Sequence, residues 1–172
     1  DVRQAGDMAG GPLYLSATAL SADVIVSVAK MKTHHWAGAT LSMKNLFGVV
    51  PGAVYGWPKN HLHFRGIEET IAALYRRFPR TIGIVDGVVA MEGNGPIQGR
   101  AIPAGVVVVG SDLAAVDATC CRIMGIDPAH IGYLNKVDGA RIHLDETAQR
   151  GENLSVLTRP FDLPPRLSHL RA

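Results

Sequence analysis

Short blocks of apolar residues alternate along the chain with segments rich in glycine and proline. The block Asp23–Ala29 is apolar on both faces, which predicts a strand in a parallel sheet that helices cover on both sides. The blocks Thr81–Asp86 and Gly105–Gly110 predict two further buried strands. Apolar residues recur at helical spacing over Gly66–Phe78, between the first two strands. The expected fold is a three-layer α/β domain, Rossmann-like, with a mostly parallel sheet and helices on both faces.

The remaining patterns predict shorter elements. Ser111 or Asp112 is expected to cap a helix that ends at Met124. We also expect loops over 1–11 and 87–105, an edge strand over 12–17, a helical turn or two over 42–50, a short helix over 128–137, a last strand over 153–158 and an extended tail from residue 159. No boundary divides the chain, so residues 1–172 are expected to form a single α/β domain. Because the chain opens at Asp1 without a methionine, we expect it to be a piece of a longer protein.

Composition narrows the classes of function. With 172 residues, 47% of them hydrophobic and 19% charged, the chain has the balance of a globular domain. A net charge of +2 without a basic stripe argues against nucleic-acid binding, and no apolar run is long enough to span a membrane. The adjacent cysteines Cys120 and Cys121 argue against a disulfide framework, and we expect both to be buried apolar groups. They do not fix the compartment; a cytoplasmic location is favoured, with export left open.

Basic and imidazole side chains gather directly after the first buried strand. In an open α/β sheet, ligands bind beyond the carboxyl ends of the strands. Ammonium groups neutralise carboxylates or phosphates, and imidazoles transfer protons or bind metals. We therefore predict a site for a small anionic molecule or a metal-bound ligand, the alternative being a solvated basic loop. The candidate residues are Lys30, Lys32, His34, Lys44, Asn45, His61 and His63.

Three acidic residues have separate interpretations. Asp86 ends a predicted strand, where it would either support the basic cluster or cap a loop through backbone N–H groups. Glu92 lies in a glycine-rich segment and is either a ligand-binding group or, as we favour, an exposed loop carboxylate. The glycines beside it are expected to let the backbone approach a ligand closely. Asp117 falls on an apolar helix face, which predicts a structural hydrogen bond to a loop backbone.

Several motifs resemble the domain-of-unknown-function family 362 (DUF362). They are KMKTHHWAGATLSMKNLFGVVPG, YGWPKNHLH, IVDGVVAMEGNGPIQG and GSDLAAVDATCCRIMG, which occur in this order, and the resemblance covers roughly Asp23 to Leu134. Some members of that family carry ferredoxin-like iron–sulfur modules. This chain has no cysteine motif for a cluster, so the resemblance implies that any cluster lies on a missing segment or on a partner. A non-catalytic partner of an iron–sulfur protein is therefore one alternative function.

A more distant similarity links the order His34, Ala37-Gly38, Lys44 and Gly52 to the lactate racemase family. That similarity implies that His34 transfers a proton, that Lys44 binds a nickel-pincer nucleotide covalently, and that His61 ligates the nickel. His63 is a second candidate metal ligand. The leading hypothesis is an enzyme that binds a small anionic metabolite or a metallo-cofactor through its Lys/His cluster, and a nickel-pincer enzyme is the other alternative.

Overall fold

A five-stranded sheet forms the centre of the molecule in the computed structural model, which describes residues 1–8, 11–56, 60–64, 66–137 and 147–171. Its strands follow the order β4-β3-β5-β6, and β7 also pairs with β5. The side chains of residues 60 and 61 lie outside the described part. The strands are β3 (Ile25–His34), β4 (Gly38–Thr40), β5 (Thr81–Asn94), β6 (Gln98–Ile102) and β7 (Val106–Gly110), and a separate hairpin consists of β1 (Val2–Met8) and β2 (Gly11–Ser16).

The α/β class is confirmed. The prediction of a mostly parallel sheet is not, because the described strands form a mixed sheet. Only β3 and β5 run parallel, whereas β3–β4, β5–β6 and β5–β7 are antiparallel. The reason lies in the connections. A parallel pair needs a crossover of a dozen or more residues. A short turn joins β5 to β6, so β6 must reverse direction, and β7, only Pro103–Gly105 further on, continues in the direction of β6 along β5.

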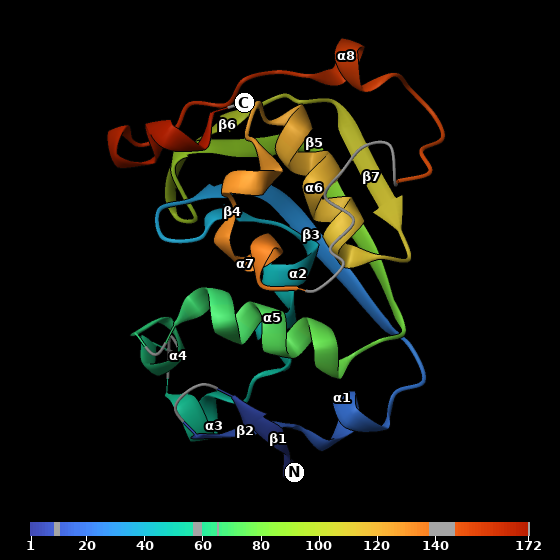
Figure 1. The fold of residues 1–172 in the computed structure, drawn as a ribbon, viewed down its shortest axis with the longest axis vertical. Coiled ribbons are helices and arrows are strands. Elements are labelled where there is room, and N and C mark those ends of the chain that lie inside the picture. Colours follow the sequence, from blue (N-terminus) through green and yellow to red (C-terminus); the bar gives the residue numbers. More distant parts are fainter. Residues whose placement is uncertain (9–10, 57–59, 65, 138–146, 172) are drawn as a thin grey trace.

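Helices α2 and α6 pack against one face of this sheet, whereas α1 and α3 lie beside the β1–β2 hairpin (Figure 1). Gly83 of β5 faces Leu113 and Ser42, which belong to two of these helices. The helices are α1 (Ala17–Ser21), α2 (Ser42–Asn45), α3 (Gly52–Tyr55), α4 (Asn60–Phe64), α5 (Ile67–Arg77), α6 (Leu113–Ile123), α7 (Gly132–Asn135) and α8 (Leu154–Leu157), with 3₁₀ segments at 46–49, 128–130 and 165–170. Along β3, Ser27, Ala29 and Met31 are buried, whereas Val26 and Val28 are exposed. We expected helices on both faces; among the described residues they cover one.

Several local predictions are confirmed. Helix α5 begins and ends within a residue of the expected bounds, and Asp112 caps α6 by accepting hydrogen bonds from the backbone N–H groups of Ala114 and Ala115. Three predictions are wrong. The region 1–11 contains β1, the region 87–105 continues β5 and contains β6, and residues 154–157 are helical because Asn153 caps them.

The C-terminal segment packs back onto the domain and is not a free tail. Phe161 is fully buried, its backbone N–H donates to the carbonyl of Met124, and the N–H of Asp127 donates to the carbonyl of Leu170. This segment runs past β6 and the 128–130 turn, so it brings its charged residues to the loop end of the sheet (Figure 1). No helix within the described ranges has both the length and the apolar character needed to cross a bilayer.

Candidate functional site

His34 occupies the last position of β3, at the tight turn into β4. The turn folds the backbone over the imidazole, so that His34 pairs with Gly38 across the ladder. Its Nδ1 accepts hydrogen bonds from the backbone N–H groups of Trp36 at 3.0 Å and Ala37 at 3.1 Å. The residue is only 2% exposed. The turn therefore fixes both the position and the orientation of the ring.

These two bonds determine the tautomer of His34. Because Nδ1 faces two N–H donors, it must present a lone pair, and the ring proton resides on Nε2. Burial, followed by the positive charge of Lys44 and of neighbouring basic groups, lowers the pKa of His34 from 6.5 to about 3. At neutral pH the ring is therefore uncharged and presents Nε2–H as a hydrogen-bond donor. No described residue accepts a hydrogen bond from that group.

Two further imidazoles flank this ring. The ring centroid of His35 lies 5.0 Å from that of His34, and the centroid of His63, on α4, lies 6.4 Å away, both in stacked geometry. The centroid of Phe47 is 5.5 Å from that of His63, and the Lys44 ammonium sits 5.0 Å from the centroid of the Phe47 ring. Of the candidate residues, His34, Lys44 and His63 thus lie near one another, whereas the side chain of His61 lies outside the described residues. We call His34, His35, Lys44, His63 and Arg166 the basic cluster.

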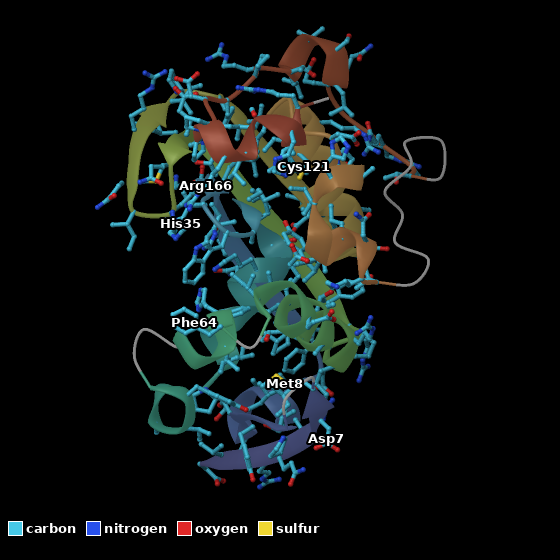
Figure 2. The ribbon with its side chains drawn as sticks, turned by 60° about the vertical axis from the view of Figure 1, so that its left-hand side comes forward. Asp7, Met8, His35, Phe64, Cys121 and Arg166 are labelled. Carbon is cyan, nitrogen blue, oxygen red and sulfur yellow. The ribbon has the colours of Figure 1, made fainter. Side chains whose placement is uncertain are left out.

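Arg166 belongs to the C-terminal segment and also acts on His34. Its positive charge is among the causes of the lowered pKa of His34. Figure 2 shows Arg166, His35 and Phe64 along the same side of the molecule. Trp36, 43% exposed, and Phe64, 78% exposed, form an aromatic edge beside the cluster with ring centroids 5.8 Å apart. The cluster therefore lies at the protein surface, with only His34 deeply buried.

Asp117 of α6 holds the segment that carries Lys44. Its carboxylate accepts hydrogen bonds from the N–H of Ser42 at 2.8 Å, the N–H of Met43 at 3.1 Å, the Ser42 hydroxyl at 2.6 Å and the Tyr133 hydroxyl at 3.1 Å. Burial raises the pKa of Asp117 to about 7, although these donors act in the opposite direction. The prediction of a structural hydrogen bond to the backbone is confirmed, but the donors belong to the first turn of the short helix α2, which carries Lys44, and not to a loop.

The same segment approaches β5 at a glycine. A Cβ atom at Gly83 would lie 2.8 Å from the Leu113 side chain and 3.1 Å from Ser42. The Ser27 hydroxyl of β3 donates to the Ser42 carbonyl at 2.7 Å. The side-chain amide of Asn45 donates to the Ser27 hydroxyl and to the Val28 carbonyl, each at 3.1 Å. The side-chain N–H groups of Asn45, a candidate ligand-binding residue, are therefore bonded to β3 and not directed to a ligand.

Asp86 is engaged away from the histidines. It lies 2.5 Å from the Lys30 ammonium and also accepts a hydrogen bond from the N–H of Val88 at 2.9 Å. The bond from Lys30, and then that from Val88, lowers the pKa of Asp86. Lys30 and Asp86 occupy the exposed face of the sheet, side by side in the β3–β5 register. The structure therefore gives Asp86 a lysine partner and a hydrogen bond to a backbone N–H of its own strand, which continues where a loop was expected. Lys32 is half-buried and lies opposite Thr40 of β4.

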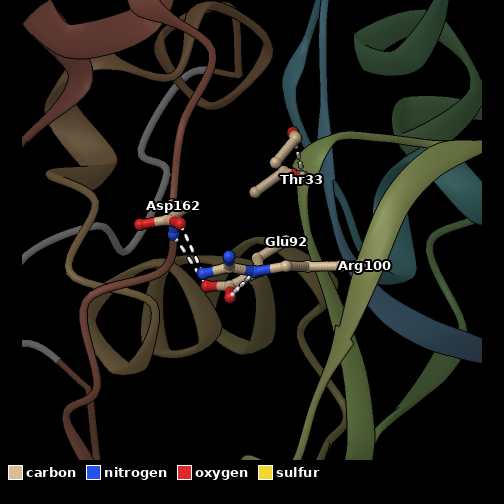
Figure 3. A network of polar contacts seen from close by, with 5 residues as sticks. Thr33, Glu92, Arg100 and Asp162 are labelled. Atoms are coloured by element: carbon tan, nitrogen blue, oxygen red, sulfur yellow. Dashed lines mark hydrogen bonds and ion pairs between the residues drawn. The ribbon is translucent and has the colours of Figure 1, made fainter.

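Glu92 is buried and ties the β5–β6 hairpin to the C-terminal segment (Figure 3). One carboxylate oxygen accepts from Arg100 Nε at 2.7 Å and the other from the backbone N–H of Asp162 at 2.8 Å. The same arginine lies 2.5 Å from the Asp162 carboxylate. The expected exposed carboxylate is wrong, and both oxygens of the candidate ligand-binding group are occupied by protein donors. Sequence reasoning missed this because the partner lies 70 residues away.

At Gly95 and Gly99, near Glu92, the close approach that glycine allows is made by other parts of the protein backbone and not by a ligand. A Cβ at Gly95 would lie 2.2 Å from the backbone oxygen of Thr33. The Gly95 carbonyl accepts the N–H of His35 at 3.1 Å and faces its Nδ1 at 2.8 Å. The hairpin therefore docks against the turn that carries the cluster histidines.

The described residues do not assemble a metal centre. No group of three or more histidine, cysteine, aspartate or glutamate side chains lies within coordinating reach of a common point in the described ranges. The side chain of His61, the predicted nickel ligand and acid/base candidate, lies outside the described residues. Cys120 and Cys121 are fully buried, which raises the pKa of both thiols well above its usual value and confirms their interpretation as apolar core groups.

A cavity of the described structure lies elsewhere. It measures about 620 Å³ and is lined by β7, α6 and residues 147–157. Neither the histidines nor Lys44 face it. The functional residues that sequence reasoning overlooked are Arg166 and the aromatic residues Trp36 and Phe47. Trp36 and Phe47 stand within the same basic segment, whereas nothing local to Arg166 indicates that it returns to the cluster.

Taken together, the fold and the site define an α/β protein with an open mixed sheet and a surface cluster of imidazoles and cations at the end of β3. The chain matches the family "Domain of unknown function (DUF362)" over residues 4–122, and it belongs to that family. It is 32% identical over 160 residues to the thylakoid-associated protein sll1697 of Synechocystis sp.. That match covers 90% of this chain but 46% of the relative, so the chain spans about half the relative's length. No solved structure matches the chain.

Proposed function

We propose that the basic cluster binds a small anionic molecule, a carboxylate or a phosphate, and that the protein acts on it as an enzyme. One observation carries this proposal. The side chains gathered around His34 are basic: the rings of His35 and His63 stack on it at 5.0 and 6.4 Å, and the positive charges of Lys44 and Arg166 act on it. An anion would supply the opposite charge, and binding it would offset the mutual repulsion of these groups.

The geometry of His34 indicates its role toward such an anion. A neutral ring with its proton on Nε2 donates a hydrogen bond, and because its pKa is lowered it does not accept a proton near neutral pH. Such a donor stabilises an oxygen on which negative charge accumulates during a reaction. The proton-transfer role that the lactate racemase resemblance implies for His34 therefore requires a different ring orientation, and proton transfer falls to His63 or His61 in this proposal.

A metallo-cofactor is the second candidate, and the described residues support it less well. A histidine binds a metal through an unprotonated nitrogen. Nδ1 of His34 is occupied by Trp36 and Ala37, and Nε2 carries the proton, so this ring does not fit as a ligand. We derive no step through nickel or through an iron–sulfur cluster. Elemental analysis of the anaerobically purified protein tests this candidate, since stoichiometric metal would support it.

Titration calorimetry with inorganic phosphate and with malonate tests the anion proposal. Lys44→Ala should weaken the binding of whichever anion binds by about tenfold or more, because it removes a charge-assisted contact worth roughly 1.5–3 kcal/mol. Lys30→Ala is the matched control, since Lys30 is paired with Asp86 on the sheet face and should leave the affinity unchanged. Equal losses in both variants would refute a specific site and indicate general electrostatic attraction. Binding that is insensitive to Lys44→Ala and Arg166→Ala would also refute it.

A further inference from the structure

One face of the central sheet carries a continuous apolar surface. Val26 and Val28 of β3 are 53% and 62% exposed, and Val107 and Val109 of β7 are 55% and 61% exposed. Ile82, between them on β5, is 38% exposed. The register places Val26 beside Ile82, Val28 beside Ile84, and Ile84 beside Val109, so these side chains share one face across three strands. We call these six residues the valine face.

Scattered exposed aliphatic residues are normal on a soluble domain, but a contiguous patch over three strands marks a surface that something covers. Strand composition supports this. The β-branched residues of the valine face have the pattern of a doubly covered strand, and β3 and β5 form a parallel pair of the kind that is almost always buried on both faces. The crossover from β3 to β5 contains α2 and α5, which supply helices to the opposite face only.

The length of the relative indicates what covers this face. The matched region accounts for 46% of the thylakoid-associated protein, so more than half of that chain lies outside the part that this chain resembles. We propose that the valine face is an internal layer boundary in the longer family members, covered by polypeptide from the part of the chain that this one does not match. The covering layer would present an aliphatic surface, with polar groups near the Lys30–Asp86 pair at one end.

The test compares the same substitution in the short chain and in the full-length relative. In the short chain, Val28→Lys and Val109→Lys should leave the thermal unfolding midpoint within about 2 °C, because both side chains are already exposed, and should lower the binding of an apolar fluorescent dye. In the full-length relative, lysine at the residue aligned with Val28 should lower the midpoint by roughly 5–10 °C, because it places a charge inside a layer boundary. Val156→Lys, on the exposed α8, and its aligned counterpart are the matched controls and should change neither protein.

Three results would overturn the proposal. An unchanged midpoint in the full-length relative would show that its aligned face is not covered. A short chain that sediments as a dimer, and that Val28→Lys converts to a monomer, would assign the face to a second copy. Sedimentation of the short chain with phosphatidylcholine vesicles, abolished by Val28→Lys, would assign the face to a lipid surface.

Discussion

Replacing Asp117 with alanine tests the idea that α6 positions the segment that carries Lys44. The carboxylate is fully buried and accepts four hydrogen bonds, two of them from the backbone N–H groups of Ser42 and Met43. The Ser42 and Tyr133 hydroxyls can rotate toward other acceptors, but the two backbone donors cannot. Each buried donor that is left unsatisfied costs about 1–3 kcal/mol.

The expected loss follows from these two donors. Their combined cost of roughly 2–6 kcal/mol is partly offset, because the substitution also removes a carboxylate that burial disfavours. We therefore expect Asp117→Ala to lower the free energy of unfolding by about 3 kcal/mol, which for a chain of this size corresponds to a fall of about 6–12 °C in the unfolding midpoint. Asp117→Asn retains one acceptor oxygen and should lose about half as much.

Urea unfolding followed by circular dichroism measures the loss, and calorimetry with phosphate or malonate measures its effect on the site. Ser155→Ala, in an exposed helix far from this segment, serves as the control and should cost less than about 1 kcal/mol. If Asp117→Ala unfolds within about 1 kcal/mol of the native protein, the four hydrogen bonds do not fix the segment and the argument fails.

Three further outcomes are expected. The folded state holds the Asp117 proton more tightly than the unfolded state does, since the pKa of Asp117 rises from 3.8 to about 7, so the contribution of Asp117 to stability should decrease from pH 4 to pH 7. The difference in unfolding midpoint between the native protein and Asp117→Asn, measured by thermal melts at several pH values, separates this decrease from the opposite trend that His34 contributes. His34 should keep its Nε2–H tautomer from pH 5 to pH 8 in ¹⁵N-resolved spectra, and titration of the ring near pH 6.5 would contradict this. The contribution of His34 to stability should be lost as the pH falls below about 6.5, because the unfolded chain then binds a proton that the folded ring does not bind. Gly95→Ala should lower the unfolding midpoint, because its Cβ would lie 2.2 Å from the Thr33 oxygen, whereas alanine at the unobstructed Gly48 should not.

The sequence was informative wherever structure is decided locally. The helical period of Gly66–Phe78 and the cap at Asp112 predicted α5 and α6 correctly, because both signals lie within a few residues of the elements they define. The basic residues after Ala29 were expected in a loop, but β3 continues to His34 and Lys44 lies on the short helix α2, because β4 and β5 supply pairing partners for the extended strand.

Secondary structure was predicted wrongly where a segment bonds to residues far away in the sequence, or where glycines were interpreted as signs of a loop. The glycines at 87, 93 and 99 suggested a loop, but β5 continues through this region because β6 and the C-terminal segment supply its hydrogen bonds and the Glu92 ion pair. The direction of β7 depends on the length of the connection after β6, which a loop assigned to 87–105 concealed. Arg166 was missed for the same reason, since its approach to His34 depends on the docking of Phe161 and Leu170.

Gly83 has a consequence for how this protein tolerates change. Because Gly83 has no Cβ atom, Leu113 and Ser42 can pack directly against β5. The distance between the sheet and the segment that carries Lys44 therefore depends on the absence of a side chain at Gly83. A single alanine there would lift the segment and alter the placement of an ammonium group that it never touches. A substitution at Gly83, in the middle of β5, would therefore change the affinity for a ligand. Mutagenesis that is limited to charged residues would not detect this effect.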